Sequence, residues 1–180
     1  MCFLDAGSNL MERGIAMCEM PFALLVDDGS PWSAGLKSIL VSRGFAVYSA
    51  GSCGEAALLL DSPDPPHMVF TSSRLPDGTW ADVLAAIRKC GFPVNAVVVS
   101  PHVDVSLYIE VLEQGGFDFV VPPFQWEEID HVIRNAMASV DFRRGLANAK
   151  RRSISQASAE ASEGGELHLR DDGFHITPLA

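Results

Sequence analysis

Residues 22–31 read FALLVDDGSP, and this stretch decides how the rest of the chain is interpreted. Its first five residues are apolar, which is typical of a strand buried on both faces of a parallel sheet. Two acids, Asp27 and Asp28, follow the strand directly. Ser30 and Pro31 then have the order of an N-cap and a first helical residue. The stretch therefore predicts a strand, an acidic loop and the beginning of a helix.

The same strand-to-helix unit recurs along the chain. We predict strands at 22–26, 45–49, 68–70, 94–100 and 117–121, and helical apolar stripes at 32–40, 56–60, 80–87, 105–112 and 129–140. This alternation predicts a doubly wound α/β domain with a five-stranded parallel sheet and helices on both faces. Functional residues in such a fold lie at the carboxyl ends of the strands.

Composition and charge narrow the function classes. The chain has 180 residues, of which 48% are hydrophobic and 20% charged, which suits one domain with extensions. Its net charge of -10 repels phosphate backbones, so we expect no nucleic-acid partner. No apolar run reaches the roughly 18 residues of a membrane helix, so we expect no membrane partner.

The cysteines and the beginning of the chain indicate a cytoplasmic protein. The four cysteines match neither a zinc pattern nor a CxxC redox pair, so we predict free thiols. Charged residues also interrupt any secretory signal near the first residue. We expect residues 1–21 to be an extension that is either disordered or a mis-assigned start, because Met11, Met17 and Met20 offer later starts.

Beyond the α/β domain, placed at residues 22–140, the sequence changes character. Residues 141–165 are basic and then polar, with the repetitive stretch SISQASAEASEGG at 153–165, and we predict a linker there. Residues 166–180 alternate polar and apolar positions around Asp171-Asp-Gly173. They predict either a small β-hairpin or a tail that orders on a partner.

The predicted strand ends carry polar residues that are candidates for a site. Asp27 and Asp28 have the oxygen ligands that Mg²⁺ prefers, although one of them capping the next helix explains the pair equally well. The third strand ends in Thr71-Ser-Ser73 before Arg74-Leu-Pro-Asp-Gly78, and the fourth ends in Ser100-Pro-His102. The fifth reads Gly116-Phe-Asp-Phe-Val-Val-Pro-Pro-Phe124.

The order of these motifs resembles the receiver domain of bacterial two-component response regulators over about residues 22–139. The resemblance implies a flavodoxin-like sheet with strand order 2-1-3-4-5. It places Asp27 and Asp28 at the family's acid pair, which would hold Mg²⁺ weakly or vestigially here. It places Ser72 where the family has its phosphoacceptor Asp, and Pro122 where it has a Lys.

The same resemblance assigns Ser100 to the family's hydroxyl switch position and Phe119 to its aromatic switch position. A serine without a neighbouring base does not replace a carboxylate nucleophile, and proline supplies neither charge nor N–H. We therefore predict a degenerate receiver that requires no cofactor and is not an enzyme. The resemblance also makes a cis bond between Pro122 and Pro123 an expectation, since X–Pro bonds adopt cis at a cost of only about 0.5–1 kcal/mol.

The predicted function is a phosphorylation-independent protein-interaction module in a two-component phosphorelay. The resemblance implies a partner surface on the fourth helix, fifth strand and fifth helix, within residues 104–139. Its expected partners are a histidine kinase or another regulator, or a second copy of the chain. An ordinary solvated face is the alternative, since Glu110, Glu113, Glu127 and Glu128 are expected there as well.

Two other functions fit the sequence less well. A flavodoxin-like cofactor-binding protein or enzyme would cradle phosphate after the first strand, where Asp27 and Asp28 would repel it. The other is nucleic-acid binding by the basic residues of 143–152. This segment has no aromatic residue and no known DNA-binding motif, so a solvated helix end is favoured there.

Overall fold

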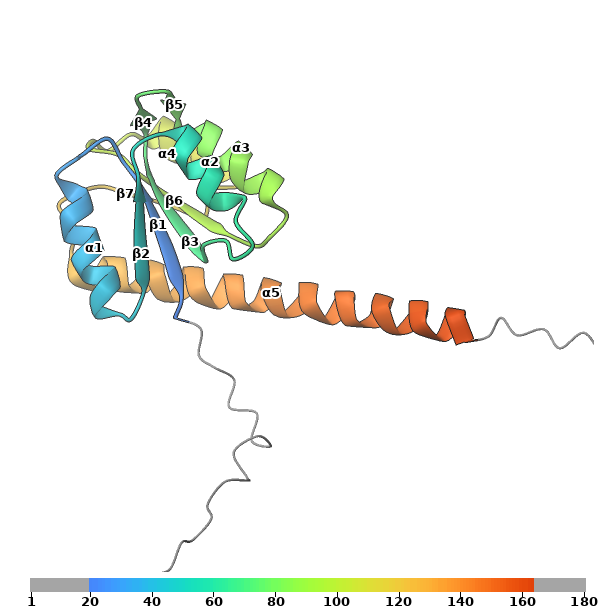
Figure 1. Cartoon of the computed structure of the whole chain (residues 1–180). Coiled ribbons are helices and arrows are strands. Elements are labelled where there is room, and N and C mark those ends of the chain that lie inside the picture. The colour runs from blue at the N-terminus through green and yellow to red at the C-terminus, as the bar shows by residue number, and fades with distance from the viewer. Residues whose placement is uncertain (1–19, 164–180) are drawn as a thin grey trace, which may run out of the picture. The chain divides into compact units, whose positions relative to one another are not determined.

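The computed structural model describes residues 20–163, and the side chains of residues 20–154. Five parallel strands form one sheet in the order β2-β1-β3-β6-β7 (Figure 1). Their bounds are β1 (Phe22–Val26), β2 (Ala46–Ala50), β3 (Met68–Ser72), β6 (Asn95–Val99) and β7 (Asp118–Val120). Counting these five strands alone, the order is 2-1-3-4-5, which confirms the predicted doubly wound architecture.

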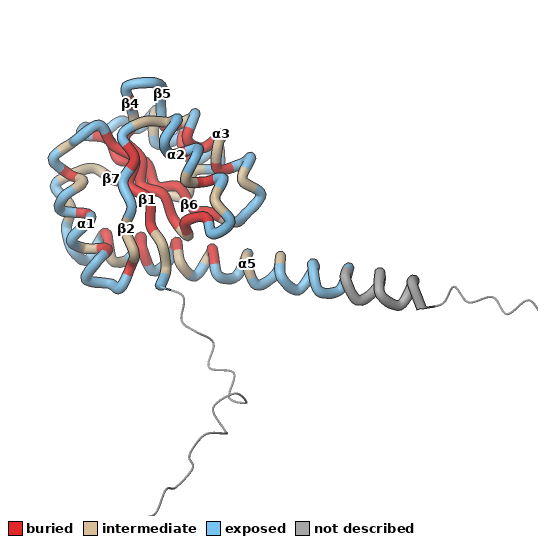
Figure 2. The backbone as a smooth tube through the Cα atoms, viewed as in Figure 1, coloured by how far each residue is buried: buried red, intermediate tan, exposed pale blue. Residues whose placement is uncertain are grey.

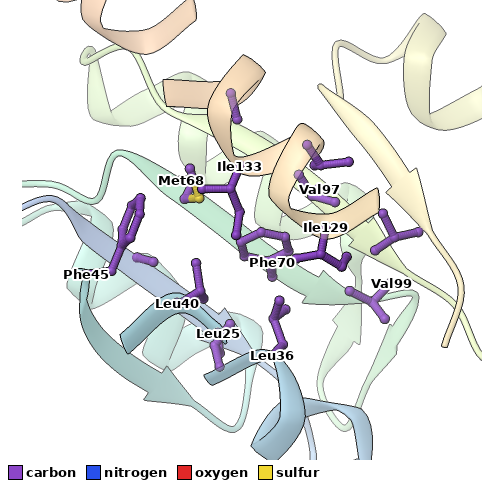
Figure 3. Close-up of a cluster of buried hydrophobic side chains, with 14 of the residues drawn as sticks. Leu25, Leu36, Leu40, Phe45, Met68, Phe70, Val97, Val99, Ile129 and Ile133 are labelled. Carbon is purple, nitrogen blue, oxygen red and sulfur yellow. The ribbon is translucent and has the colours of Figure 1, made fainter. Parts of the chain in front are cut away.

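Helices cover both faces of this sheet. They are α1 (Trp32–Ser42), α2 (Cys53–Leu60), α3 (Trp80–Cys90), α4 (Val105–Glu113) and α5 (Trp126–Glu163). One apolar core packs α1 and the first turns of α5 against the sheet, around Phe70 and Ile129 (Figure 3). A second core packs α2, α3 and part of α4 against the other face. Because both faces are covered, the central strands are the most deeply buried part of the domain (Figure 2).

Local signals in the sequence set several helix ends as predicted. The Ser52 hydroxyl oxygen accepts a hydrogen bond from the Glu55 N–H at 3.1 Å at the beginning of α2. Gly91 ends α3 with a φ of 73°, a left-handed conformation that glycine adopts without strain. The predicted cap at Ser30 is wrong, since its hydroxyl donates to Asp28 Oδ1 at 3.0 Å and no side chain caps α1.

The turn after β3 contains a small hairpin that the sequence did not predict. Strands β4 (Arg74–Leu75) and β5 (Gly78–Thr79) pair antiparallel to form it. A capping box between Thr79 and Asp82 then begins α3, with the Asp82 carboxylate accepting from the Thr79 N–H at 2.8 Å. The hairpin lies directly beside the carboxyl end of β3, and so forms part of the site described below.

The predicted linker is helical as far as the structure describes it. Helix α5 continues to Glu163, whereas we expected the domain's last helix to end near Val140 and a polar linker to follow. Between Gly145 and Glu163 the sequence has neither proline nor glycine and is rich in alanine, which is the strongest helix former. Small polar composition was therefore a poor guide to conformation in this segment.

The chain forms two units, one ending at Val140 and one beginning at Asp141. Predictions for residues 1–19 and for the 166–180 hairpin lie outside the described residues. Among residues 20–163, no helix is long and apolar enough to cross a membrane.

The bond between Pro122 and Pro123, in the loop after β7, is cis, which confirms the expectation of a cis bond at this position.

Candidate functional site

The acid pair after β1 lies in a tight loop whose conformation depends on one of the two carboxylates. Asp27 Oδ1 accepts hydrogen bonds from the N–H groups of Gly29 at 2.8 Å and Ser30 at 2.9 Å. Asp27 is buried, whereas Asp28 is exposed and accepts from the Ser30 hydroxyl. Asp27 thus holds the loop, but neither acid caps α1, so the capping interpretation of the pair is wrong. Asp28 presents its carboxylate to solvent.

Ser72 ends β3, the central strand of the sheet, and its hydroxyl is the most unusual group of the site. The residue is only 7% exposed, and no hydrogen-bond partner for its Oγ is present among the described residues. A buried hydroxyl without a partner destabilises a fold by about 1–3 kcal/mol. No carboxylate or histidine among residues 20–154 bonds to this oxygen, so none of them activates it as a nucleophile.

Ser100 and Phe119 come from the two strands beyond β3. Ser100 directly follows β6 and is buried, and its Oγ accepts from the His102 N–H at 3.4 Å. Phe119 lies in β7 and is half-buried, with its ring edge-on to Tyr108 of α4 at a centroid distance of 6.1 Å. The sheet therefore brings Asp27, Ser72 and Ser100 to one edge, while Phe119 contacts the helix beside it.

A cavity of about 750 Å³ opens at this edge, between α1 and the loop after β7. Trp32 and Ile39 line its α1 side, and Pro122, Pro123 and Phe124 line the loop side. Trp32 and Phe124 meet edge-on with a centroid distance of 6.4 Å. Pro122 has no polar side-chain atom, so this wall offers a bound anion no cation.

The donor set does not match a dedicated Mg²⁺ site. Asp27 and Asp28 provide carboxylate oxygens, and Asp27 Oδ1 already accepts two backbone N–H groups. Within the described residues, no group of three or more His, Cys, Asp or Glu side chains could hold a metal ion. One or two carboxylates hold Mg²⁺ when a phosphate group supplies further oxygen ligands. Here Ser72 adds only a hydroxyl to the carboxylates of Asp27 and Asp28.

Asp77, the acid nearest to Ser72 in the sequence, has a structural role that the sequence analysis missed. Its carboxylate accepts from the N–H groups of Cys53 at 2.7 Å and Gly54 at 2.9 Å, at the beginning of α2. These two bonds lower the pKa of Asp77 below its usual value. Burial, followed by the charge of Asp77, raises the pKa of the Cys53 thiol to about 11. Asp77 lies 24 positions after Cys53 and 23 positions after Gly54, and no local sequence signal links residues that far apart.

The outer face of α4 carries a group of exposed apolar side chains. Val105, Tyr108, Ile109 and Leu112 are all at least 40% exposed. Glu110 and Glu113 of the same helix are exposed as well, which confirms that acids are present on this surface. Contiguous apolar groups within a polar surface mark protein contact sites more often than isolated ones do.

Comparison with known proteins identifies relatives of the whole domain. The family model described as "Response regulator receiver domain" matches residues 23–134. The chain is 27% identical over 155 residues to the transcriptional regulatory protein KdpE of Mycobacterium tuberculosis, over 83% of this chain and 68% of that protein. It is 25% identical over 114 residues to the chemotaxis protein CheY of Bacillus subtilis, over 63% of this chain and 95% of that protein.

Other relatives are matched over only part of their length. The aligned region covers 31% of the C4-dicarboxylate transport transcriptional regulatory protein DctD of Rhizobium meliloti, at 29% identity over 82% of this chain. Among solved structures, the signal receiver domain of a putative LuxO repressor from Vibrio parahaemolyticus has a TM-score of 0.63 at 18% identity, over 70% of this chain and 96% of that one. The latter likeness concerns the fold alone.

Proposed function

Because this chain belongs to the family of response regulator receiver domains, we propose that it is a receiver-like signalling protein whose protein contacts do not depend on phosphorylation. In this proposal it acts in a two-component phosphorelay without being an enzyme. The observation that carries the proposal is Ser72, which ends β3 with a buried hydroxyl that no described residue activates. A phosphoaspartate requires a carboxylate at the position where this family accepts the phosphoryl group.

The loop after β7 supports the same proposal. A cation at Pro122 would lie on the cavity wall that faces Ser72 and would stabilise a bound phosphoryl group. Proline has no side-chain donor, and its ring fixes its own φ, while Pro123 restricts Pro122 to extended conformations. The segment next to Phe119 therefore has fewer conformations available than an ordinary loop. A ligand shifts a conformational equilibrium only through differential affinity, and this sequence has neither a carboxylate at position 72 nor a cation at position 122 to hold a phosphoryl ligand.

The proposed contact surface is the α4-β7-α5 face, with the exposed apolar residues of α4 at its centre. Ile109 is 50% exposed and would contribute apolar area on binding, and Tyr108 connects the surface to Phe119. The partner would be a histidine kinase, another regulator or a second copy of this chain. Alternative binding of a flavodoxin-type cofactor is not favoured by the family match.

The test measures affinity for a captured partner with and without beryllofluoride, a phosphoryl mimic, in the presence of Mg²⁺. We expect equal affinities within error. Ile109→Asp should weaken binding by about ten-fold or more, because it places a charge in an apolar contact. Leu58→Asp, at an exposed leucine of α2, is the matched control and should leave binding unchanged. An affinity that rises several-fold with beryllofluoride would refute the proposal.

A further inference from the structure

Residues 142–154 of α5 form an amphipathic segment with a narrow apolar seam. Small or apolar side chains recur there at spacings of four, three and four residues, at Phe142, Leu146, Ala149 and Ser153. Phe142 is 68% exposed and Leu146 is 57% exposed, so the seam is open to solvent. This spacing is typical of a helix that packs along one other helix, and the small side chains of Ala149 and Ser153 permit a close approach.

Basic side chains flank this seam. Residues 142–154 contain five arginines or lysines and no acid, in a chain whose net charge is -10. Lys150 lies one helical turn after Leu146, and Arg152 lies three residues after Ala149, so the two cations border the seam on opposite sides. Both side chains are exposed. The segment therefore presents an apolar line between positive charges.

Helix α4 carries a complementary surface. Its exposed apolar residues Val105, Ile109 and Leu112 recur at spacings of four and three residues, which is the same helix-packing pattern. Glu113 lies four residues after Ile109 and therefore on the same side of the helix, and both Glu110 and Glu113 are exposed. The sequence of α4, VSLYIEVLE, contains no basic residue. This helix therefore presents an apolar line beside negative charges.

The charges favour a contact between these two unlike surfaces over a contact between two like ones. Two copies of segment 142–154 would bring only cations together, and two copies of α4 would bring only carboxylates together, so each like pair would repel. Segment 142–154 of one molecule against α4 of another instead joins the two apolar lines. It also sets the cations of the one against the glutamates of the other. Every copy of the chain carries both surfaces, so the complementary partner is present wherever the protein is.

Other anionic partners suit segment 142–154 less well. A bilayer surface binds helices that have a broad apolar face, whereas this seam has only two large apolar side chains, Phe142 and Leu146. A phosphate backbone would neutralise the cations but would leave these two side chains in water. An apolar line beside acids, as on α4, meets both requirements.

We propose that residues 142–154 of one molecule bind α4 of a second copy of this chain. The inference rests on the proposed function, because it uses the same α4 contact surface and names a second copy as the partner. The two helical segments are about 20 Å and about 14 Å long, so the contact is small and we expect a Kd between about 1 µM and 1 mM. Because the surfaces that meet are unlike, reciprocal exchange gives a closed pair and one-way contact gives a longer row of molecules.

Sedimentation equilibrium of the full chain over about 10 µM to 1 mM measures this self-association. We expect the wild type to associate, and to associate more weakly as salt is raised, because salt screens exposed charges. Glu110→Lys/Glu113→Lys places cations beside the apolar line of α4, and Lys150→Glu/Arg152→Glu places acids beside the seam. Each double variant should weaken self-association by about ten-fold or more.

Mixing the two double variants identifies which surfaces meet. The mixture contains an intact segment 142–154 and an intact α4, carried by different molecules. The two variants should therefore associate with each other, at an affinity near that of the wild type, although each associates poorly with itself. A symmetric contact between two copies of either helix would instead leave one of the variants associating with itself as the wild type does.

Lys37→Glu/Lys89→Glu is the matched control. It makes the same change in net charge as the double variant of segment 142–154, at two exposed lysines of α1 and α3. It should associate as the wild type does. Circular dichroism shows whether each variant keeps its helices.

Three results would overturn the inference: a wild type that stays monomeric up to about 1 mM, a double variant that associates with itself as tightly as the wild type, or two variants that do not associate when mixed. A monomeric wild type whose Lys150→Glu/Arg152→Glu variant loses binding to a DNA duplex, or to phosphatidylserine vesicles, would assign the segment to that partner instead. Beryllofluoride with Mg²⁺, added to the associating wild type, reports separately on the proposed function. A several-fold change in affinity there would refute phosphorylation independence, whereas the mixing experiment would still decide which surfaces meet.

Discussion

Replacing Ser72 with alanine should stabilise the protein, which is the opposite of what most buried substitutions do. The Ser72 hydroxyl is buried and has no partner among the described residues, so the folded state loses its hydration without compensation. Leaving such a group unsatisfied costs about 1–3 kcal/mol, and alanine removes the group while keeping the Cβ. We expect Ser72→Ala to raise the free energy of unfolding by about 1 kcal/mol. For a chain of this size, that corresponds to a rise in Tm of about 2–4 °C.

Urea denaturation followed by circular dichroism measures this difference, provided that the slope against urea is unchanged. Ser52→Ala is the matched control, because the Ser52 hydroxyl oxygen accepts from the Glu55 N–H as an N-cap. It should lower the free energy of unfolding by about 1 kcal/mol. The two Ser→Ala substitutions should therefore move stability in opposite directions. A loss of about 1 kcal/mol or more in Ser72→Ala would show instead that the hydroxyl has a stabilising partner.

Three further predictions concern the rest of the domain. Gly116→Ala should lower the free energy of unfolding by about 1–3 kcal/mol in urea denaturation, because its Cβ would lie 2.9 Å from the Val111 carbonyl oxygen; an unchanged midpoint would contradict the packing. The folded pKa of Asp77 is below its unfolded value, so its carboxylate stabilises the fold above pH of about 4 and this contribution is lost as the pH falls through the folded pKa. The difference in Tm between the wild type and Asp77→Asn should accordingly shrink from pH 7 to pH 3, and a constant difference would exclude this linkage. Mg²⁺ should bind weakly in calorimetry, and tight one-to-one binding that Asp28→Asn abolishes would contradict the two-carboxylate donor set.

The five strands and the helix between each pair could be predicted because local patterns determine them, whereas the order of the strands in the sheet was implied by the family resemblance. The apolar run at 22–26 forms an almost entirely buried strand, and Gly91 ends α3 in the left-handed conformation that glycine favours. Helix α5 was the exception. The small polar residues of 153–163 were interpreted by composition, while alanine and glutamate without proline or glycine favour a helix.

The candidate site was predictable in position but not in its contacts. Carboxyl ends of parallel strands meet at one edge, so the sequence could bring Asp27, Ser72 and Ser100 together. The unbonded hydroxyl, the cavity beside Trp32 and the cap that Asp77 makes on α2 depend on side-chain packing between distant segments. No periodicity in the sequence encodes such contacts.

We propose that this receiver domain makes its contacts without a phosphoryl group on Ser72 or elsewhere at the edge of the sheet. Intact-mass spectrometry of the full chain, after incubation with acetyl phosphate and Mg²⁺, tests it most directly. A receiver that carries the family's Asp and Lys serves as the positive control under the same conditions. We expect an unchanged mass for this protein while the control gains one phosphoryl group. A stoichiometric adduct that mild base removes would show that the protein is phosphorylated after all.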